Sequence, residues 1–116
     1  MHAAYHLVSE PWFRTQLAAA PYLPEAFAED GFVHLTHGLA EVLAAGNRYC
    51  VADPRPYLLL TVDLDYLSAE IRYDDPARQF PHVYGPLERV AITRAQHVER
   101  DAAGCFVGVS LDDCGG

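Results

Sequence analysis

The segment YLLLTVDLD, residues 57–65, constrains the fold more than any other part of the sequence. Its apolar residues are almost continuous over the length of one strand, a pattern typical of strands buried on both faces. Such a strand needs a covering layer on each side, so we expect it at the centre of a sheet. Residues 3–9 and 32–35 predict earlier buried strands, and residues 71–73 and 90–94 predict later ones.

Two segments between these strands carry helix signals. In SEPWFRTQLAAAPY, Ser9 is placed to cap a helix whose first turn holds an acid and a proline, and later prolines end it. In THGLAEVLAAGNRYC, Thr36 is the expected cap of a second helix with apolar residues at helical spacing. Two early helices followed by a mostly antiparallel sheet predict an α+β fold.

The length of the chain fits a single domain. Its 116 residues can enclose one hydrophobic core and leave little room for a second. We assign residues 1–100 to one domain. The C-terminal tail, residues 101–116, holds one apolar patch and ends in flexible residues, so it is expected to add an edge strand or to be disordered.

The charge of the chain disfavours one class of partner. Sixteen acidic residues face eight basic ones, and the formal net charge of -8 repels the phosphates of long nucleic acids and of anionic lipids. A small anion remains an acceptable ligand, because one arginine or a helix N-terminus can bind it locally. We therefore expect a small-molecule ligand, no nucleic acid and no membrane, while the sequence leaves the oligomeric state open.

No segment predicts export or a membrane span. The amino-terminal residues lack the basic segment and long apolar core of a secretory signal, and no apolar run approaches the roughly 20 residues of a membrane helix. The expected location is the cytoplasm. Cys50, Cys105 and Cys114 are then expected to be free thiols, because their odd number and wide spacing suit neither a disulfide framework nor a zinc knuckle.

The predicted strands at residues 3–9 and 32–35 and the strand-like run of residues 80–87 each carry one histidine within an apolar pattern: His6, His34 and His82. Side chains alternate across a strand, so His82 and Tyr84 in FPHVYGPL point to the same side. For any one of the three, a buried neutral imidazole bonded to a carbonyl or hydroxyl is the commoner explanation. Three such histidines in one chain are consistent with a shared polar cleft or with a structural hydrogen-bond network. The residues alone do not decide between these two arrangements.

Two other polar features carry weaker signals. Arg48 lies near the end of the second predicted helix, where a cation interacts favourably with the helix dipole. Its planar guanidinium would also bind a phosphate or carboxylate through two hydrogen bonds. His34 and His37 have a metal-like spacing. No acidic third ligand or cysteine pair accompanies them, so we predict no metal site.

Five segments taken in order resemble a widespread bacterial family, a domain of unknown function. They are YHLV, GFVHLT, GNRY, LLLTVDLDYLSAEIRYD and FPHVYGPL, and the resemblance covers roughly residues 4–95. The family is similar to the ADP-ribosyltransferase-like α+β architecture. The resemblance therefore implies a split pair of small sheets around a cleft that holds NAD in active relatives.

The resemblance also implies roles for individual residues. His6 matches the position that binds the ribose of NAD, and His34 and Thr36 match the motif that lines the nicotinamide pocket. Glu88 is the nearest candidate for a late glutamate of that architecture, with His82 and Tyr84 as the alternatives for its place.

These expectations lead to two hypotheses. In the first, the chain transfers ADP-ribose from NAD in a nucleotide pocket whose catalytic side chains are His6, His34, His82, Tyr84 and Glu88, with Thr36 and Arg48 as ligand-binding residues. In the second, the same fold is a noncatalytic module that binds a small ligand.

Overall fold

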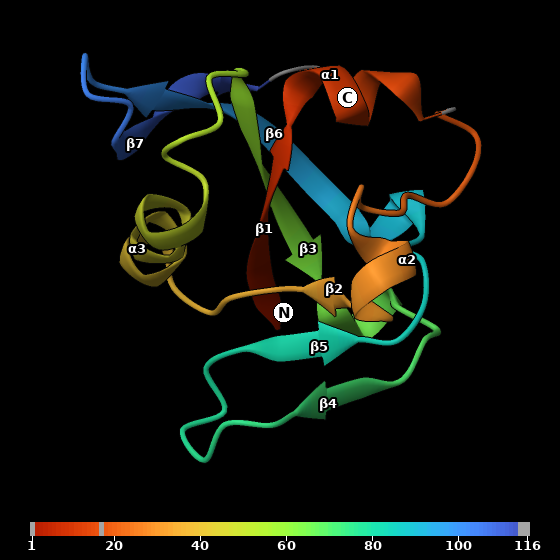
Figure 1. Cartoon of the computed structure of the whole chain (residues 1–116). Helices are drawn as coiled ribbons and strands as arrows, with labels where there is room; N and C mark the ends of the chain where they lie inside the picture. The colour runs from red at the N-terminus through yellow and green to blue at the C-terminus, as the bar shows by residue number, and fades with distance from the viewer. Residues whose placement is uncertain (1, 17, 114–116) are drawn as a thin grey trace.

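Two antiparallel sheets and three α-helices make up the described part of the computed structural model (Figure 1). The structure describes residues 2–16 and 18–113, and it describes side chains as far as residue 110. The predicted thiol of Cys114 therefore lies outside the described residues. The arrangement is α+β, as expected from the sequence.

The larger sheet has four strands in the order β1-β3-β6-β7. Strand β3 (Tyr57–Asp63) pairs with β1 (Ala3–Ser9) on one side and with β6 (Ile92–Arg100) on the other. Every residue of β3 except Thr61 is buried, which confirms the central strand predicted from its apolar run. Strand β7 (Phe106–Asp113) pairs with β6 and forms one edge of this sheet.

The smaller sheet has three strands in the order β2-β5-β4. Strand β5 (Pro81–Val83) lies between β2 (Val33–His34) and β4 (Ile71–Tyr73). One backbone bridge, between Tyr5 and Thr36, connects β1 to the chain just after β2. This bridge brings the edge of the large sheet next to the small sheet.

The first predicted helix is present but shorter than expected. Helix α1 (Glu10–Thr15) begins where the Ser9 side chain accepts a hydrogen bond from the backbone N–H of Trp12 at 3.3 Å, so the predicted cap is confirmed. The helix ends because Gln16 is already extended. The expected continuation through Leu17 falls on a residue outside those described.

Thr36 is not a helix cap, contrary to the prediction. Helix α3 (Leu39–Tyr49) is preceded by Gly38, whose φ of 94° is a conformation that glycine adopts without strain. Thr36 is held extended because its backbone N–H and C=O both pair with Tyr5. A short helix that the sequence did not predict, α2 (Phe27–Asp30), precedes β2. Two 3₁₀ turns, Leu64–Tyr66 and Arg89–Ala91, complete the elements.

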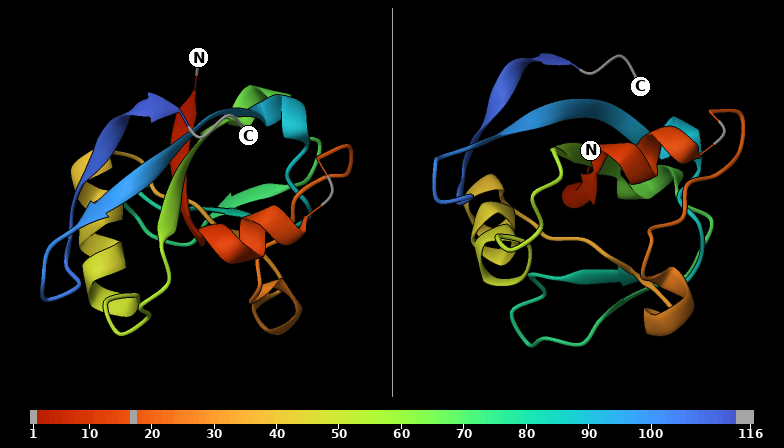
Figure 2. Two further views of the ribbon diagram at one scale, coloured as in Figure 1. Left: turned by 90° about the horizontal axis from the view of Figure 1, so that it is seen from above. Right: turned by 45° about the horizontal axis from the view of Figure 1, so that its top comes forward.

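The main core lies between the two sheets. Leu58, Leu60 and Val62 from β3 meet Val33 and Val83 from the small sheet, and all five are fully buried. Helix α3 covers the opposite face of the large sheet (Figure 2).

Helix α3 contacts both edge strands, β1 and β7, so the four-stranded sheet curls around it. Gly46 permits this approach, because a Cβ there would lie 2.2 Å from the Phe106 ring and 2.7 Å from Leu7. No helix among the described residues is long and apolar enough to cross a membrane.

Candidate functional site

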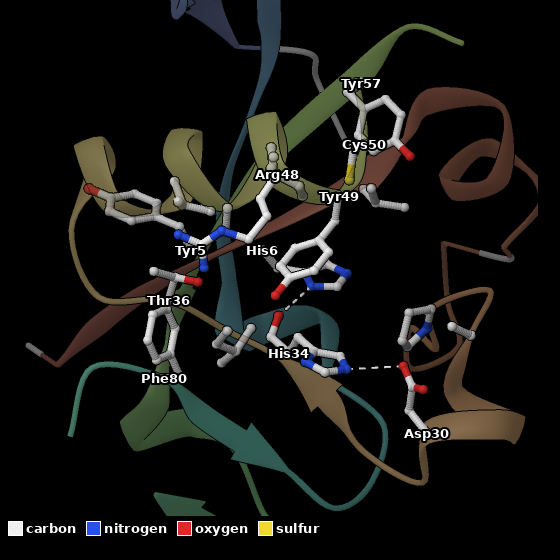
Figure 3. A pocket seen from close by; sticks show the side chains of 18 of the residues that line it. Tyr5, His6, Asp30, His34, Thr36, Arg48, Tyr49, Cys50, Tyr57 and Phe80 are labelled. Carbon is white, nitrogen blue, oxygen red and sulfur yellow. Dashed lines mark hydrogen bonds and ion pairs between the residues drawn. The ribbon is translucent and has the colours of Figure 1, made fainter. Parts of the chain in front are cut away.

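A cavity of about 900 Å³ lies between α3, the edge strand β1 and the small sheet (Figure 3). Five of the side chains singled out from the sequence line it, and they come from separate parts of the chain: His6, His34, Thr36, Arg48 and His82. Tyr84 and Glu88 are not among the residues of its wall. The fold thus gathers most of the predicted set around one space.

His6 is buried and has both ring nitrogens occupied. Its Nδ1 lies 2.8 Å from the backbone oxygen of His34, and its Nε2 lies 2.9 Å from the Tyr22 hydroxyl. Because a carbonyl only accepts, Nδ1 carries the proton, and Nε2 accepts from Tyr22. Burial lowers the pKa of His6 to about 4, so the ring is neutral at physiological pH. His6 therefore links the two sheets and is a poor proton donor or acceptor.

The backbone of β1 offers an open edge beside His6. Tyr5 uses its N–H and C=O to pair outward with Thr36, so its pairing with β3 is of the non-hydrogen-bonded type. Residues two apart along a strand repeat this orientation, and Leu7 therefore points its N–H and C=O away from β3. Leu7 lines the cavity, and its backbone has no hydrogen-bond partner among the described residues. This edge can pair with an amide group of a ligand.

His34 and His82 form a second kind of histidine site on the outer face of the small sheet. They are directly opposite each other in the pairing of β2 with β5, and their ring centroids lie 5.5 Å apart. Each ring bonds one carboxylate: His34 Nε2 lies 3.0 Å from Asp30, and His82 Nδ1 lies 3.0 Å from Asp74. Neither histidine is buried, and each keeps one ring nitrogen without a partner among the described residues.

Arg48 is the only arginine among the described residues of the cavity wall. It extends from the last turn of α3 into the space in front of His6 and Thr36, next to Tyr49 (Figure 3). Its guanidinium makes no hydrogen bond or ion pair with any described residue, and its nearest ring contact is Tyr49 at 5.8 Å. Tyr49 is 76% exposed, and Phe80 is a second exposed aromatic residue of the wall.

Thr36 places a hydroxyl in the cavity wall on a fixed stretch of backbone. Its backbone is fixed by the two bonds to Tyr5, and the residue is 6% exposed. The hydroxyl has no hydrogen-bond partner among the described side chains and backbone. It is therefore available to a ligand in the cavity.

Tyr84 and Glu88 occupy other surroundings. The Tyr84 ring packs against Phe32 at 5.3 Å and beneath the guanidinium of Arg72 at 4.8 Å. Glu88 accepts a hydrogen bond from the backbone N–H of Ser68 at 3.0 Å. The side chain of Ser68, and to a lesser extent nearby backbone groups, hold the pKa of the Glu88 carboxyl below its usual value. Its Oε1 is buried without a hydrogen-bond partner among the described residues. Glu88 therefore serves the turn between the sheets rather than the cavity.

Carboxylates outnumber cations around the cavity. The wall includes five acidic residues that the sequence did not single out for a site: Glu25, Asp30, Glu41, Asp74 and Asp75. Four of them already bond arginine, histidine or backbone groups, which leaves Glu41 without a polar partner among the described residues. A ligand of low net negative charge suits this wall better than a polyanion.

His37, whose spacing from His34 suggested only a metal ligand, is a partly buried histidine with both ring nitrogens occupied. Its Nδ1 donates to the backbone oxygen of Ala3 at 3.1 Å, and its Nε2 accepts from the Tyr73 hydroxyl at 2.7 Å. Among the described residues, no group of three or more His, Cys, Asp or Glu side chains is arranged to hold a metal ion. Cys50 also lines the cavity, and burial raises the pKa of its thiol, so it is not an activated nucleophile.

Comparison with known proteins places the chain in a family. The family model described as "Protein of unknown function (DUF952)" matches residues 8–95, which include most of the cavity wall. The chain belongs to the DUF952 family. The match to DUF952 begins two residues after His6 and ends before β7. No match was found among curated proteins.

Two solved structures have the same fold as this DUF952 chain. The crystal structure of protein CC0527 from Caulobacter crescentus has a TM-score of 0.75 and 22% sequence identity, covering 95% of each chain. The solution NMR structure of the same protein has a TM-score of 0.66 and 22% identity, covering 96% of this chain and 93% of that one. At this identity the likeness concerns the fold alone.

Proposed function

We propose that the cavity binds NAD or a closely related nucleotide of low net charge. The observation that carries the proposal is the open backbone edge at Leu7, which lies in the same cavity as the unpaired guanidinium of Arg48. The edge presents one donor and one acceptor, which is the complement of a carboxamide such as that of nicotinamide. The guanidinium suits one phosphate of the same molecule.

The remaining wall fits the other properties of NAD. Nicotinamide in NAD is a cationic ring, and the excess of carboxylates around the cavity favours a cation. The exposed rings of Tyr49 and Phe80 offer stacking surfaces for a planar base. The resemblance to the ADP-ribosyltransferase-like architecture supports NAD as the ligand, because active relatives hold NAD in a cleft between two small sheets.

Isothermal titration calorimetry with the purified chain tests this proposal. NAD should bind more tightly than ATP, whose phosphates meet the acidic wall, and more tightly than nicotinic acid adenine dinucleotide, whose carboxylate cannot donate to the Leu7 carbonyl. Arg48→Gln should weaken NAD binding by about tenfold or more, since it removes one charged hydrogen bond. Arg14→Gln is the matched control, because Arg14 bonds Glu10 outside the cavity. Equal affinity of the Arg48→Gln variant and the unmodified chain for NAD would contradict the proposal.

ADP-ribosyl transfer from NAD is the second candidate. Breaking the bond between nicotinamide and ribose develops positive charge on the sugar, which a nearby carboxylate stabilises. Glu41 lies on the wall and has no polar partner among the described residues, so it is better placed for this role than Glu88. Release of nicotinamide from NAD, followed by chromatography, separates the two candidates. Transfer predicts that Glu41→Gln abolishes release while Glu88→Gln leaves it unchanged, and a binding module predicts no release at all.

A further inference from the structure

The paired histidines on the outer face of the small sheet have the arrangement of an acid and a base. Strands β2 and β5 place His34 and His82 opposite each other, and both rings line the cavity. Their centroid separation is 5.5 Å. The two rings meet edge to face, so a small group that lies beside the pair, on the cavity side, can contact both within hydrogen-bond distances of roughly 3 Å.

The carboxylates set which nitrogen of each ring is available. Asp30 accepts from Nε2 of His34, which leaves Nδ1 as the reactive atom, and Asp74 accepts from Nδ1 of His82, which leaves Nε2. A carboxylate on one nitrogen also stabilises the ring when the other nitrogen takes up a proton. Each histidine is therefore held in one tautomer with one nitrogen ready to exchange protons.

Phe32 fixes the orientation of both rings. Its centroid lies 4.1 Å from His82 in a stacked arrangement and 4.6 Å from His34. The other charged groups near the pair are Arg72, directly opposite His82 in the pairing of β4 with β5, and Asp75 at the cavity wall. The side chain of His82 is 17% exposed and that of His34 is 59% exposed, so solvent and ligand can reach the pair.

We propose that His34 and His82 act as general base and general acid in the hydrolysis of a nucleotide phosphodiester. The proposal rests on the nucleotide binding proposed above, with the phosphate held near Arg48. A diester carries a single negative charge, which one guanidinium can match on an otherwise acidic wall. The class of substrate is therefore a cyclic or terminal phosphodiester of a nucleoside rather than a polyphosphate.

The step balances with water as the only co-reactant. One unprotonated ring nitrogen takes a proton from water as the water oxygen forms a bond to phosphorus. The bond from phosphorus to the leaving sugar oxygen breaks, and the protonated ring of the partner histidine donates its proton to that oxygen. The products are a phosphomonoester and a free hydroxyl, and the two rings exchange protons with solvent to restore the starting state.

Hydrolysis of 2′,3′-cyclic AMP by the purified chain, followed by chromatography, tests the inference. The expected result is turnover above buffer with a bell-shaped pH dependence. His34→Asn and His82→Gln should each lower the rate by about 100-fold and each remove one limb of the bell. His2→Gln is the control, because His2 bonds Asp65 outside the cavity wall, and it should keep the full rate.

Two further measurements separate the possible failures. NAD titration of the unmodified chain is the companion measurement, so an unmodified chain that binds NAD but does not turn over the diester overturns the acid–base pair and leaves the binding proposal intact. If a histidine variant does not fold, Asp30→Asn and Asp74→Asn keep both rings and should lower the rate by about tenfold. Turnover at the full rate in the histidine variants would overturn the inference.

Discussion

The junction between the two sheets and the outer face of the small sheet use the same residue type in opposite ways. At the junction, His6 and His37 each donate to a carbonyl and accept from a tyrosine hydroxyl, so both nitrogens are occupied. On the outer face, His34 and His82 each bond one carboxylate and keep one nitrogen without a partner among the described residues.

This difference separates structural imidazoles from chemically available ones. A ring with both nitrogens satisfied inside the protein gains stability from its bonds and loses its capacity to exchange protons, since either change of protonation breaks a bond. A ring anchored at one nitrogen is oriented but remains reactive at the other. The cavity therefore has one wall built on histidine as a structural link and another wall where histidine can act on a ligand.

The largest expected effect concerns the junction. His6→Ala should lower the free energy of unfolding by about 3 kcal/mol, because it leaves a cavity and removes the partners of the Tyr22 hydroxyl and the His34 carbonyl. His34→Ala, the outer-face control, should change it by only about 0.5 kcal/mol. Urea unfolding followed by circular dichroism measures both. Equal effects of the two substitutions would remove the distinction between the regions.

The pH dependence of stability should report the same junction. Burial lowers the pKa of His6 from 6.5, the ordinary value of a histidine, to about 4 in the folded chain. The unfolded chain therefore binds a proton first as pH falls, so the free energy of unfolding decreases from about pH 6.5 to about pH 4 and this contribution levels off below that. The loss should amount to roughly 3 kcal/mol. Urea unfolding across this range should show a weaker pH dependence for His6→Gln than for the unmodified chain, and matching curves would contradict the assignment.

Much of the fold was predictable from local patterns. The continuous apolar run predicted the central strand β3, the apolar run of residues 3–9 predicted strand β1, and Ser9 predicted the start of α1. The failures lie where a distant segment decides the local structure. Thr36 has the composition of a helix cap, but pairing with Tyr5 keeps it extended.

The sequence indicated which histidines matter, but it did not separate structural histidines from those with a free ring nitrogen. Periodicity indicates which face of a strand a side chain occupies, and it does not identify the partner of each ring nitrogen. The partner of His6 Nε2 is Tyr22, which comes from a loop between α1 and α2. The carboxylate of Asp74 reaches His82 across the turn between β4 and β5. These contacts depend on the folded chain, which is why a cleft and a network were equally consistent with the sequence.

A smaller effect should come from the tyrosines that complete the junction. Tyr22→Phe leaves the buried Nε2 of His6 without a donor and should lower the free energy of unfolding by about 2 kcal/mol. Tyr73→Phe removes the donor to His37, which is only partly buried, and should lower it by about 1 kcal/mol. Chemical denaturation ranks the two. A larger loss for Tyr73→Phe would indicate that His37, rather than His6, is the stronger link between the sheets.

The smallest effect on stability is expected for the two aspartates that bond the outer histidines. Asp74→Asn and Asp30→Asn disrupt contacts between an exposed aspartate and a histidine at the surface, so each should change the free energy of unfolding by less than about 0.5 kcal/mol. The amide can accept from the same ring nitrogen only weakly, or donate to it, in which case the ring changes tautomer and its free nitrogen carries the proton. Phosphodiester turnover should therefore fall although the fold is unchanged. At the junction we expect the opposite: Tyr22→Phe lowers the free energy of unfolding but does not disturb a proton transfer, because His6 takes no part in one. If the aspartate variants lost stability and kept turnover, the outer histidines would be structural as well.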